Sequence, residues 1–275
     1  MPLSNKVSSD SPIGMFDSGF GGLTVARALI DLMPQENLVY IGDTVRYPYG
    51  NKPADEVRGY AKELAWSLVR EYGAKMIVVA CNTAASVALD ELVDELPVPV
   101  IGVIDPGARA LVRVTRNNKV GVIGTVGTIS SGAYVQAIRA TGASVALTSA
   151  ACPGFVEFVE RDQTTGDEVM VLAERLLAPV RDAGVDALLL GCTHYPYLSR
   201  VISDVMGPEV VLVSSADETA FIVKQELEAT QLMRTGADNS TGEHKFLSSG
   251  DIAWFAQLGR RLLGPELETA TQWKN

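Results

Sequence analysis

Short apolar runs alternate with amphipathic stretches along almost the whole chain. Because these runs are apolar on both faces, they are typical of parallel strands that helices cover on both sides. The alternation therefore predicts an α/β fold. The predicted strands span residues 13–16, 38–41, 76–80, 100–103, 120–123, 144–147, 187–190, 210–213 and 244–247.

Polar and proline signals between these runs predict where helices begin. Pro179 stands inside the helix that is expected from about residue 167, and that helix should bend or end near it. The predicted starts are Pro53, Asp105 as a cap with Pro106 as the first residue, Thr165 with Glu168 as a capping box, and Pro196.

Two landmarks recur in the chain at nearly the same spacing. The run and turn at 13–18 resemble those at 120–125, 107 residues later, and Cys81-Asn82-Thr83 resembles Cys192-Thr193-His194, 111 residues later. A solenoid would need more copies at a shorter period. The repeat predicts two pseudo-symmetric, doubly wound α/β domains with mainly parallel sheets.

The predicted domain boundaries follow from this repeat. Residues 1–12 are expected to form a polar, flexible tail, residues 13–104 with 216–275 the first domain, and residues 105–215 the second. The segment after residue 216 is too small to stand alone, so it should pack onto the first domain. Because open parallel sheets bind ligands at the carboxyl ends of their strands, the active site is expected in the cleft between the domains.

Charge and cysteine content narrow the classes of partner. A formal charge of −10 argues against nucleic-acid binding, which depends on clustered lysines and arginines. No apolar run approaches membrane-spanning length, so no membrane contact is expected. Three cysteines without a secretion signal predict free thiols and a cytoplasmic protein.

Cys81 and Cys192 each follow an apolar strand and precede a polar pair that can start a helix. The dipole and N–H groups of a helix N-terminus stabilise a thiolate, so a useful thiolate fraction is expected near neutral pH. Two thiols at equivalent places of two similar halves suggest an acid and a base on opposite sides of one substrate, as inversion at carbon requires. Cys152, before Pro153, lacks this context and is expected to be structural.

Polar residues near these two loops could assist the thiols. Asp17 ends the first strand and His194 lies two residues after Cys192, so both could move protons. The segment 47–50 follows a strand end and is a candidate wall or lid. The hydroxyl groups that could anchor a small carboxylate belong to Ser18, Thr83, Thr125 and Thr193.

Cofactor chemistry fits the sequence less well. The glycine-rich loop 17–22 with Asp43 imitates a dinucleotide fingerprint, but Thr24 replaces the third glycine and Asp17 would repel a pyrophosphate. The cysteines and His194 include no closely spaced pair of zinc ligands. No lysine stands at a strand end, which disfavours a Schiff base with pyridoxal phosphate. We therefore expect neither a cofactor nor a metal.

Two readings of a different kind stay open at this point. Cys192 could be a covalent nucleophile with His194 as its base, in a racemase or hydrolase that acts on another small acid. The two domains could instead close on an amino acid without chemistry, as in a binding protein. A binding protein, however, has no need of two equivalent thiols.

The chain resembles the glutamate racemases of the cofactor-independent aspartate/glutamate racemase superfamily, from about Ile13 to its last helix. Together, the motifs that carry the resemblance are highly specific. They are Phe16–Thr24, Pro48-Tyr49-Gly50, Ala80–Ala84, Gly124-Thr125 with Thr128, Cys152-Pro153 with Glu157 and Glu160, and Gly191–Pro196.

This resemblance implies a cytoplasmic homodimer that interconverts L-glutamate and D-glutamate without a cofactor and supplies D-glutamate for peptidoglycan. It implies that Cys81 deprotonates the D-isomer, assisted by Asp17, and that Cys192 deprotonates the L-isomer, assisted by His194. Glu160, or else Glu157, would be a further acidic participant. The implied substrate-binding residues are Asp17, Ser18, Pro48, Tyr49, Gly50, Asn82, Thr83, Thr125, Thr193 and His194.

Overall fold

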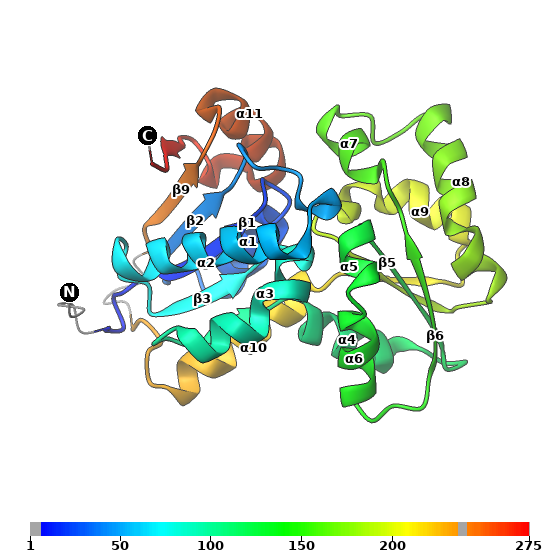
Figure 1. Cartoon of the computed structure of the whole chain (residues 1–275), viewed down its shortest axis with the longest axis horizontal. Coiled ribbons are helices and arrows are strands. Elements are labelled where there is room, and N and C mark those ends of the chain that lie inside the picture. Colours follow the sequence, from blue (N-terminus) through cyan, green and yellow to red (C-terminus); the bar gives the residue numbers. More distant parts are fainter. Residues whose placement is uncertain (1–6, 236–240, 275) are drawn as a thin grey trace.

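The structure is a computed structural model that describes residues 7–235 and 241–274. Two separate parallel sheets form its framework, and helices cover both (Figure 1). Of the expected flexible tail, residues 1–6 lie outside the described part. Farther along that tail, Lys75 donates a hydrogen bond to the carbonyl of Ser9, and Asn37 donates one to the carbonyl of Asp10.

The larger sheet has six strands in the order β10-β9-β2-β1-β3-β4, and every pair in it is parallel. Its last two strands come from the C-terminal segment, so that segment does pack onto the first half of the chain, as expected. The strands are β1 (Ile13–Asp17), β2 (Leu38–Gly42), β3 (Met76–Val79), β4 (Val100–Gly102), β9 (His244–Ser248) and β10 (Thr271–Gln272).

The smaller sheet has four parallel strands in the order β6-β5-β7-β8. The order β2-β1-β3-β4 in the first sheet has the same form, which agrees with the sequence repeat. The strands are β5 (Lys119–Gly124), β6 (Ala146–Ala151), β7 (Ala187–Gly191) and β8 (Val211–Val213).

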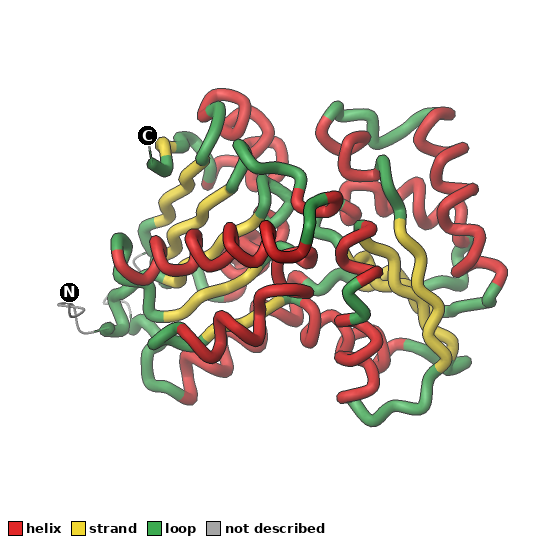
Figure 2. Tube along the Cα trace, in the orientation of Figure 1, coloured by secondary structure: helices red, strands yellow, loops and turns green. Residues whose placement is uncertain are grey.

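Helices α2 and α3 pack together on one face of the six-stranded sheet, and α1 packs with α10 and α11 on the other (Figures 1 and 2). They are α1 (Leu23–Leu32), α2 (Ala54–Arg70), α3 (Asn82–Glu95), α10 (Ala216–Ala229) and α11 (Ile252–Leu263), with the short 3-10 turns η1 (Tyr49–Asn51) and η4 (Gly264–Glu266).

Around the four-stranded sheet, α8 packs against α9, and α4 packs against α6. The helices are α4 (Ile104–Val114), α5 (Val126–Ser130), α6 (Ala133–Ala140), α7 (Phe155–Glu160), α8 (Asp167–Asp182) and α9 (Ser199–Met206), with the 3-10 turn η2 (Tyr195–Leu198). None of the helices in the described part of the chain is long and apolar enough to cross a membrane.

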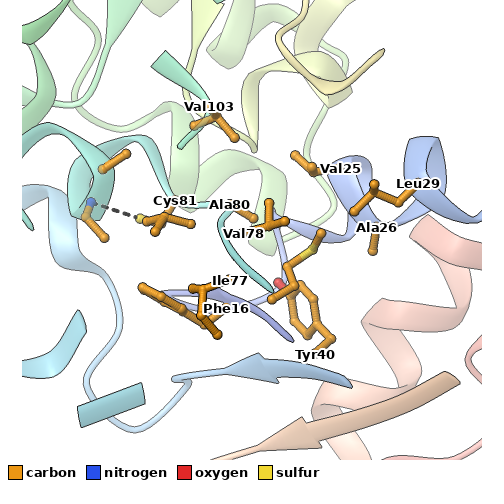
Figure 3. Close-up of a cluster of buried hydrophobic side chains, with 14 of the residues drawn as sticks. Phe16, Val25, Ala26, Leu29, Tyr40, Ile77, Val78, Ala80, Cys81 and Val103 are labelled. Carbon is orange, nitrogen blue, oxygen red and sulfur yellow. Dashed lines mark hydrogen bonds between the residues drawn. The ribbon is translucent and has the colours of Figure 1, made fainter. Parts of the chain in front are cut away.

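The strands of the larger sheet are buried on both faces, as their apolar runs predicted. Every residue of β1, β2 and β3 is buried. In the close-up, Phe16 of β1, Tyr40 of β2 and Val78 of β3 belong to one cluster, and Cys81 lies at its edge (Figure 3). The thiol is therefore held by the core of the fold.

Three predicted element starts were wrong. The strand expected at 144–147 is β6, which starts at Ala146, because pairing with β5 fixes its register from Lys119 opposite Ala146 to Gly124 opposite Ala151. Helix α8 starts at Asp167 after Gly166, and no side chain caps it, so Thr165 is not the cap. Helix α4 begins at Ile104, two residues before Pro106, and Asp105 lies in its first turn instead of capping it.

Helix α8 continues past Pro179 and ends three residues later, at Asp182, in agreement with an expected end near this proline. Proline lacks an N–H group, so the helix loses one hydrogen bond at this position. Pro179 lies three positions before the last residue of the helix, where tertiary packing offsets that loss: Leu177 and Val180 on either side of it are fully buried.

Candidate active site

Both sequence-predicted cysteine loops open into one small pocket of about 20 Å³ between the two sheets. The loops reach it because they follow the carboxyl ends of β3 and β7, which are interior strands of their sheets. The pocket is lined by Ser18, Tyr47, Pro48, Tyr49, Gly50, Cys81, Asn82, Thr83, Thr125, Val156, Cys192, Thr193 and His194.

This lining contains all but two of the residues expected at the site. The exceptions, Asp17 and Glu160, do not line the pocket, and each lies behind a residue that does. A larger hollow of about 440 Å³ lies elsewhere, between α3, β4 and α4, and its lining includes neither a thiol nor a histidine. The chemistry-bearing side chains therefore converge on the small pocket.

Cys81 caps the N-terminus of helix α3. Its sulfur accepts a hydrogen bond from the N–H of Ala84 at 3.5 Å, and its thiol donates to Oγ of Ser18 at 3.7 Å. The backbone bond appears as a dashed line in Figure 3. The side chain is 5% exposed, so its sulfur is almost enclosed by protein.

Cys192 occupies the corresponding place after β7, but the local structure differs. A 3-10 turn follows it instead of an α-helix, and α9 begins only at Ser199. The sulfur of Cys192 lies 3.9 Å from Nδ1 of His194. The second thiol therefore has an imidazole as its neighbour, whereas the first has a hydroxyl and a helix terminus.

The expectation of partly ionised thiols was wrong for both cysteines. Burial raises the pKa of Cys81 to about 12, and it also raises the pKa of Cys192. Backbone N–H groups lower both pKa values, but loss of hydration outweighs them because the charged form is the better solvated one. Each thiol must hand its proton to a neighbour before it can act as a base.

Asp17 is the neighbour of Cys81. Its carboxylate is fully buried; Oδ2 accepts the N–H groups of Gly19 and Gly22, while Oδ1 has no partner. Burial raises the pKa of Asp17, and the negative charge of Asp17 raises the pKa of Cys81. The hydrogen bond from the Cys81 thiol, in contrast, lowers the pKa of Asp17, so the pair favours a single negative charge.

His194 and Glu160 are the groups that accompany Cys192, as Asp17 accompanies Cys81. Nε2 of His194 lies 3.9 Å from Oε1 of Glu160, and neither atom has a hydrogen-bond partner. Burial lowers the pKa of His194 to about 4 and raises the pKa of Glu160 to about 8. At neutral pH the imidazole is therefore neutral and able to accept a proton.

Hydroxyl groups form the opposite part of the pocket. Thr83 of α3 lies 3.0 Å from Thr125 and 3.2 Å from Thr128, oxygen to oxygen, so the network links the two sheets. Asn82 accepts a hydrogen bond from Tyr134, but its Nδ2 has no partner. The pocket thus offers several hydrogen-bond donors to an anion.

Tyr49 lines the pocket, but its hydroxyl is directed elsewhere. That hydroxyl donates to Oδ2 of Asp43, which also accepts from Arg46. The next residue, Gly50, packs against the side chain of Thr125, where an added β-carbon would lie 2.8 Å from Cβ of Thr125. The 3-10 turn η1 therefore contacts the second half of the chain at the pocket.

Sequence reasoning did not single out three residues that surround His194. They are Phe20, Gly21 and Tyr47. Phe20 and Gly21 belong to the glycine-rich loop, in which neither was expected to contact the histidine, and Tyr47 was expected only as part of a wall or lid at 47–50, which the pocket lining agrees with. A contact between distant halves of a chain leaves no signal in local spacing.

Cys152 and Glu157 lie outside the pocket lining. The thiol of Cys152 donates to the carbonyl of Ala150 at 4.0 Å and lies in a hydrophobic cluster, and burial raises its pKa to about 12. Within residues 7–235 and 241–274, no cluster of His, Cys, Asp and Glu side chains has the arrangement of a metal site.

The chain is similar in sequence to known proteins. Residues 23–220 match the Asp/Glu/Hydantoin racemase family. The chain is 50% identical to the glutamate racemase of Corynebacterium diphtheriae, over 94% of this chain and 96% of that one.

Solved structures show the same similarity. The crystal structure of a glutamate racemase from Bacillus anthracis matches with a TM-score of 0.88 and 38% identity, covering 97% of this chain and 98% of that one. The glutamate racemase of Francisella tularensis, solved in complex with D-glutamate, matches with a TM-score of 0.88 and 30% identity over the same shares.

Proposed function

The chain belongs to the glutamate racemases of the Asp/Glu/hydantoin racemase family, and from this we propose that it interconverts L-glutamate and D-glutamate by a two-base transfer of the α-proton. The observation that carries the mechanism is the presence of Cys81 and Cys192 in one pocket, at the ends of strands from different sheets. A base on one face and an acid on the other are what inversion of an α-carbon needs.

Each thiol has a proton acceptor next to it. Cys81 passes its proton to Asp17 when D-glutamate is bound, and the resulting thiolate removes the α-hydrogen. Because the pair favours one negative charge, moving that charge from Asp17 to sulfur needs no further buried charge.

In the other direction, Cys192 passes its proton to Nδ1 of His194, and the thiolate removes the α-hydrogen of L-glutamate. The imidazolium that forms faces Glu160 through Nε2. Ionisation of Glu160 would compensate that positive charge, which gives this carboxyl a role that Glu157 does not share. In each direction the opposite thiol returns a proton to the carbanion.

The remaining polar groups suit a small amino acid that carries two carboxylates. Donors from Ser18, Asn82 and Thr193 line the pocket with the threonine network and the turn at Tyr49 and Gly50. Hydrogen bonds to the α-carboxylate would stabilise the charge that spreads onto it as the α-proton leaves. Burial strengthens those bonds because the surroundings have a low dielectric constant. The D-glutamate bound to the Francisella tularensis relative supports the choice of substrate.

We extend the proposal to the cellular context and to the organisation of the chain. The enzyme would supply D-glutamate for peptidoglycan in the cytoplasm, work without a cofactor and form a homodimer. Its domains would comprise residues 13–104 with 216–275 and residues 105–215, which agrees with the membership of the two sheets.

Racemisation in deuterium oxide tests the reaction. L-glutamate should give D-glutamate that carries α-deuterium, and the L-glutamate left at early times should keep its α-hydrogen, because donor and acceptor are different thiols. Proton NMR follows the exchange and circular dichroism follows the inversion, without added cofactor.

Cys81→Ala and Cys192→Ala should each abolish racemisation, with Cys152→Ala as the matched control. Full racemisation by both active-site variants would refute the two-thiol mechanism. Binding of glutamate by the wild-type protein with no exchange and no inversion would instead indicate an amino-acid-binding protein.

A further inference from the structure

We propose that Phe20 and Tyr47 are positioning residues, supplied by the half of the chain that carries Cys81, which hold the imidazole of His194 in a dry, fixed place beside Cys192. This inference rests on the proposed function, because it assigns these rings to the Cys192 side of the reaction. It makes the readiness of the second thiol depend on contact between the two halves.

The geometry of the rings carries the inference. Phe20 meets His194 edge to face, with centroids 5.1 Å apart and planes at 64°, and Tyr47 lies 6.0 Å from the imidazole at 34°. Phe20 is 1% exposed and is itself supported by Trp254 of helix α11, at 5.3 Å. These aromatic contacts fix the ring plane, so Nδ1 stays directed at Cys192.

Besides the two rings, backbone also encloses the imidazole of His194. An added β-carbon at Gly21 would overlap both Nδ1 of His194 and Oγ1 of Thr193. Only glycine lets the loop after β1 approach the turn after β7 this closely. With the rings and this backbone around it, all from residues 20–47, the side chain of His194 is 3% exposed.

Few charged or titratable groups face the imidazole. Among the described residues, the thiol of Cys192 lies on the Nδ1 side and the carboxyl of Glu160 on the Nε2 side, the phenol of Tyr47 lies beside the ring, and Tyr197 stands on the following turn. The lowered pKa of His194 is due to burial. Water admitted beside the ring would therefore restore the ordinary pKa and leave the imidazole protonated in mildly acidic solution.

The chain contains two histidines, which makes this testable by NMR. The ring C–H signals of His194 and His244 can be titrated directly, and His194→Asn assigns them by removing one. Tyr47 is partly exposed, so Tyr47→Ala should admit water beside the imidazole of His194 without removing a core residue. Tyr47→Phe is the matched control, because it keeps the ring.

In Tyr47→Ala the titration midpoint of His194 should rise by about one pH unit or more, and the acid limb of kcat/KM should move up with it. In Tyr47→Phe both should match the wild type. His244, at the end of β9 that lies away from the pocket, should keep its midpoint in all variants and so reports an intact fold. If Tyr47→Ala does not fold, Tyr47→Gln replaces the ring with a hydrated amide and carries the same expectation.

An unchanged His194 midpoint in the folded variant would overturn the proposal, even if activity falls. The titration does not depend on turnover. A wild-type protein that fails to racemise glutamate would refute the proposed function, but the NMR titration of His194 would still test the role of Tyr47.

Discussion

The hydroxyls of Thr83 and Thr125 lie 3.0 Å apart and join the N-terminus of helix α3 to that of helix α5 across the pocket. Thr125 also caps α5, because its oxygen accepts the N–H of Thr128. One side chain therefore serves both the local helix and the contact between the two halves.

Thr125→Val should weaken substrate binding more than it weakens the fold. Valine keeps the volume but loses the hydroxyl, and one hydrogen bond to a charged carboxylate is worth about 1.5–3 kcal/mol. We expect KM for both enantiomers to rise about tenfold or more, while urea denaturation shows a loss of about 1 kcal/mol from the missing cap. Thr125→Ser, which keeps the hydroxyl, is the control, and an unchanged KM in Thr125→Val would remove Thr125 from the substrate site.

Gly50→Ala should damage the pocket through its contact with Thr125. The new β-carbon would lie 2.8 Å from Cβ of Thr125, and overpacking of this kind costs about 1–3 kcal/mol. If that cost falls on the closed, substrate-bound form, kcat/KM should drop by about tenfold. Steady-state kinetics with both enantiomers provides the measurement. If Gly50→Ala had the kcat/KM of the wild type, the turn η1 would be able to shift away from Thr125 at no cost to catalysis.

Gly59→Ala is the matched glycine substitution for that experiment. Gly59 lies inside helix α2, and no atom lies within 4 Å of its added β-carbon. Alanine stabilises a helix interior by about 0.5–1 kcal/mol relative to glycine. The free energy of unfolding of Gly59→Ala should rise by that amount, and kcat/KM should not change.

The pH dependence of stability should report the burial of Glu160. Its pKa is about 8 in the folded protein, against an ordinary value of about 4.3, so between these values the folded state binds more protons than the unfolded state. The contribution of Glu160 to the free energy of unfolding is therefore fully present below about pH 4.3 and is lost as pH rises through 8.

Urea unfolding at several pH values from 5 to 8 tests this sign. The wild type should lose stability across that range relative to Glu160→Gln, which cannot ionise, and Glu157→Gln on the same helix controls for the loss of a negative charge. Parallel curves for wild type and Glu160→Gln would contradict the raised pKa.

Cys152→Ala should leave catalysis almost intact. The thiol lies outside the pocket, donates to a backbone carbonyl, and has a pKa of about 12 because it is buried. We expect kcat and KM within about twofold of wild type and a loss of about 1 kcal/mol in stability from the smaller side chain. A large fall in kcat with an unchanged fold would assign Cys152 a part in the chemistry.

Some local features of the fold could be predicted because short-range chemistry controls them. The apolar runs at 13–16 and 76–80 predicted β1 and β3, since residues buried on both faces must be apolar whatever surrounds them. Helix α2 begins directly after Pro53, as expected, with Asp55 and Glu56 in its first turn.

Other starts depended on partners that are distant in the chain. Strand β6 includes Thr148 and Ser149, which carry little hydrophobic signal, because pairing with β5 extends it to Ala151. Helix α8 starts after Gly166, whose φ of 108° is readily adopted only by glycine, so backbone geometry outweighed the capping box expected at Thr165.

The sequence by itself determined the α/β class, the internal repeat and the placing of both thiols directly after apolar strands, because these follow from hydrophobic patterning and residue type along the chain. Only the tertiary structure decided the protonation of those thiols and of His194. Their pKa values depend on how completely water is excluded, and water is excluded here by packing between segments as distant as Phe20 and His194.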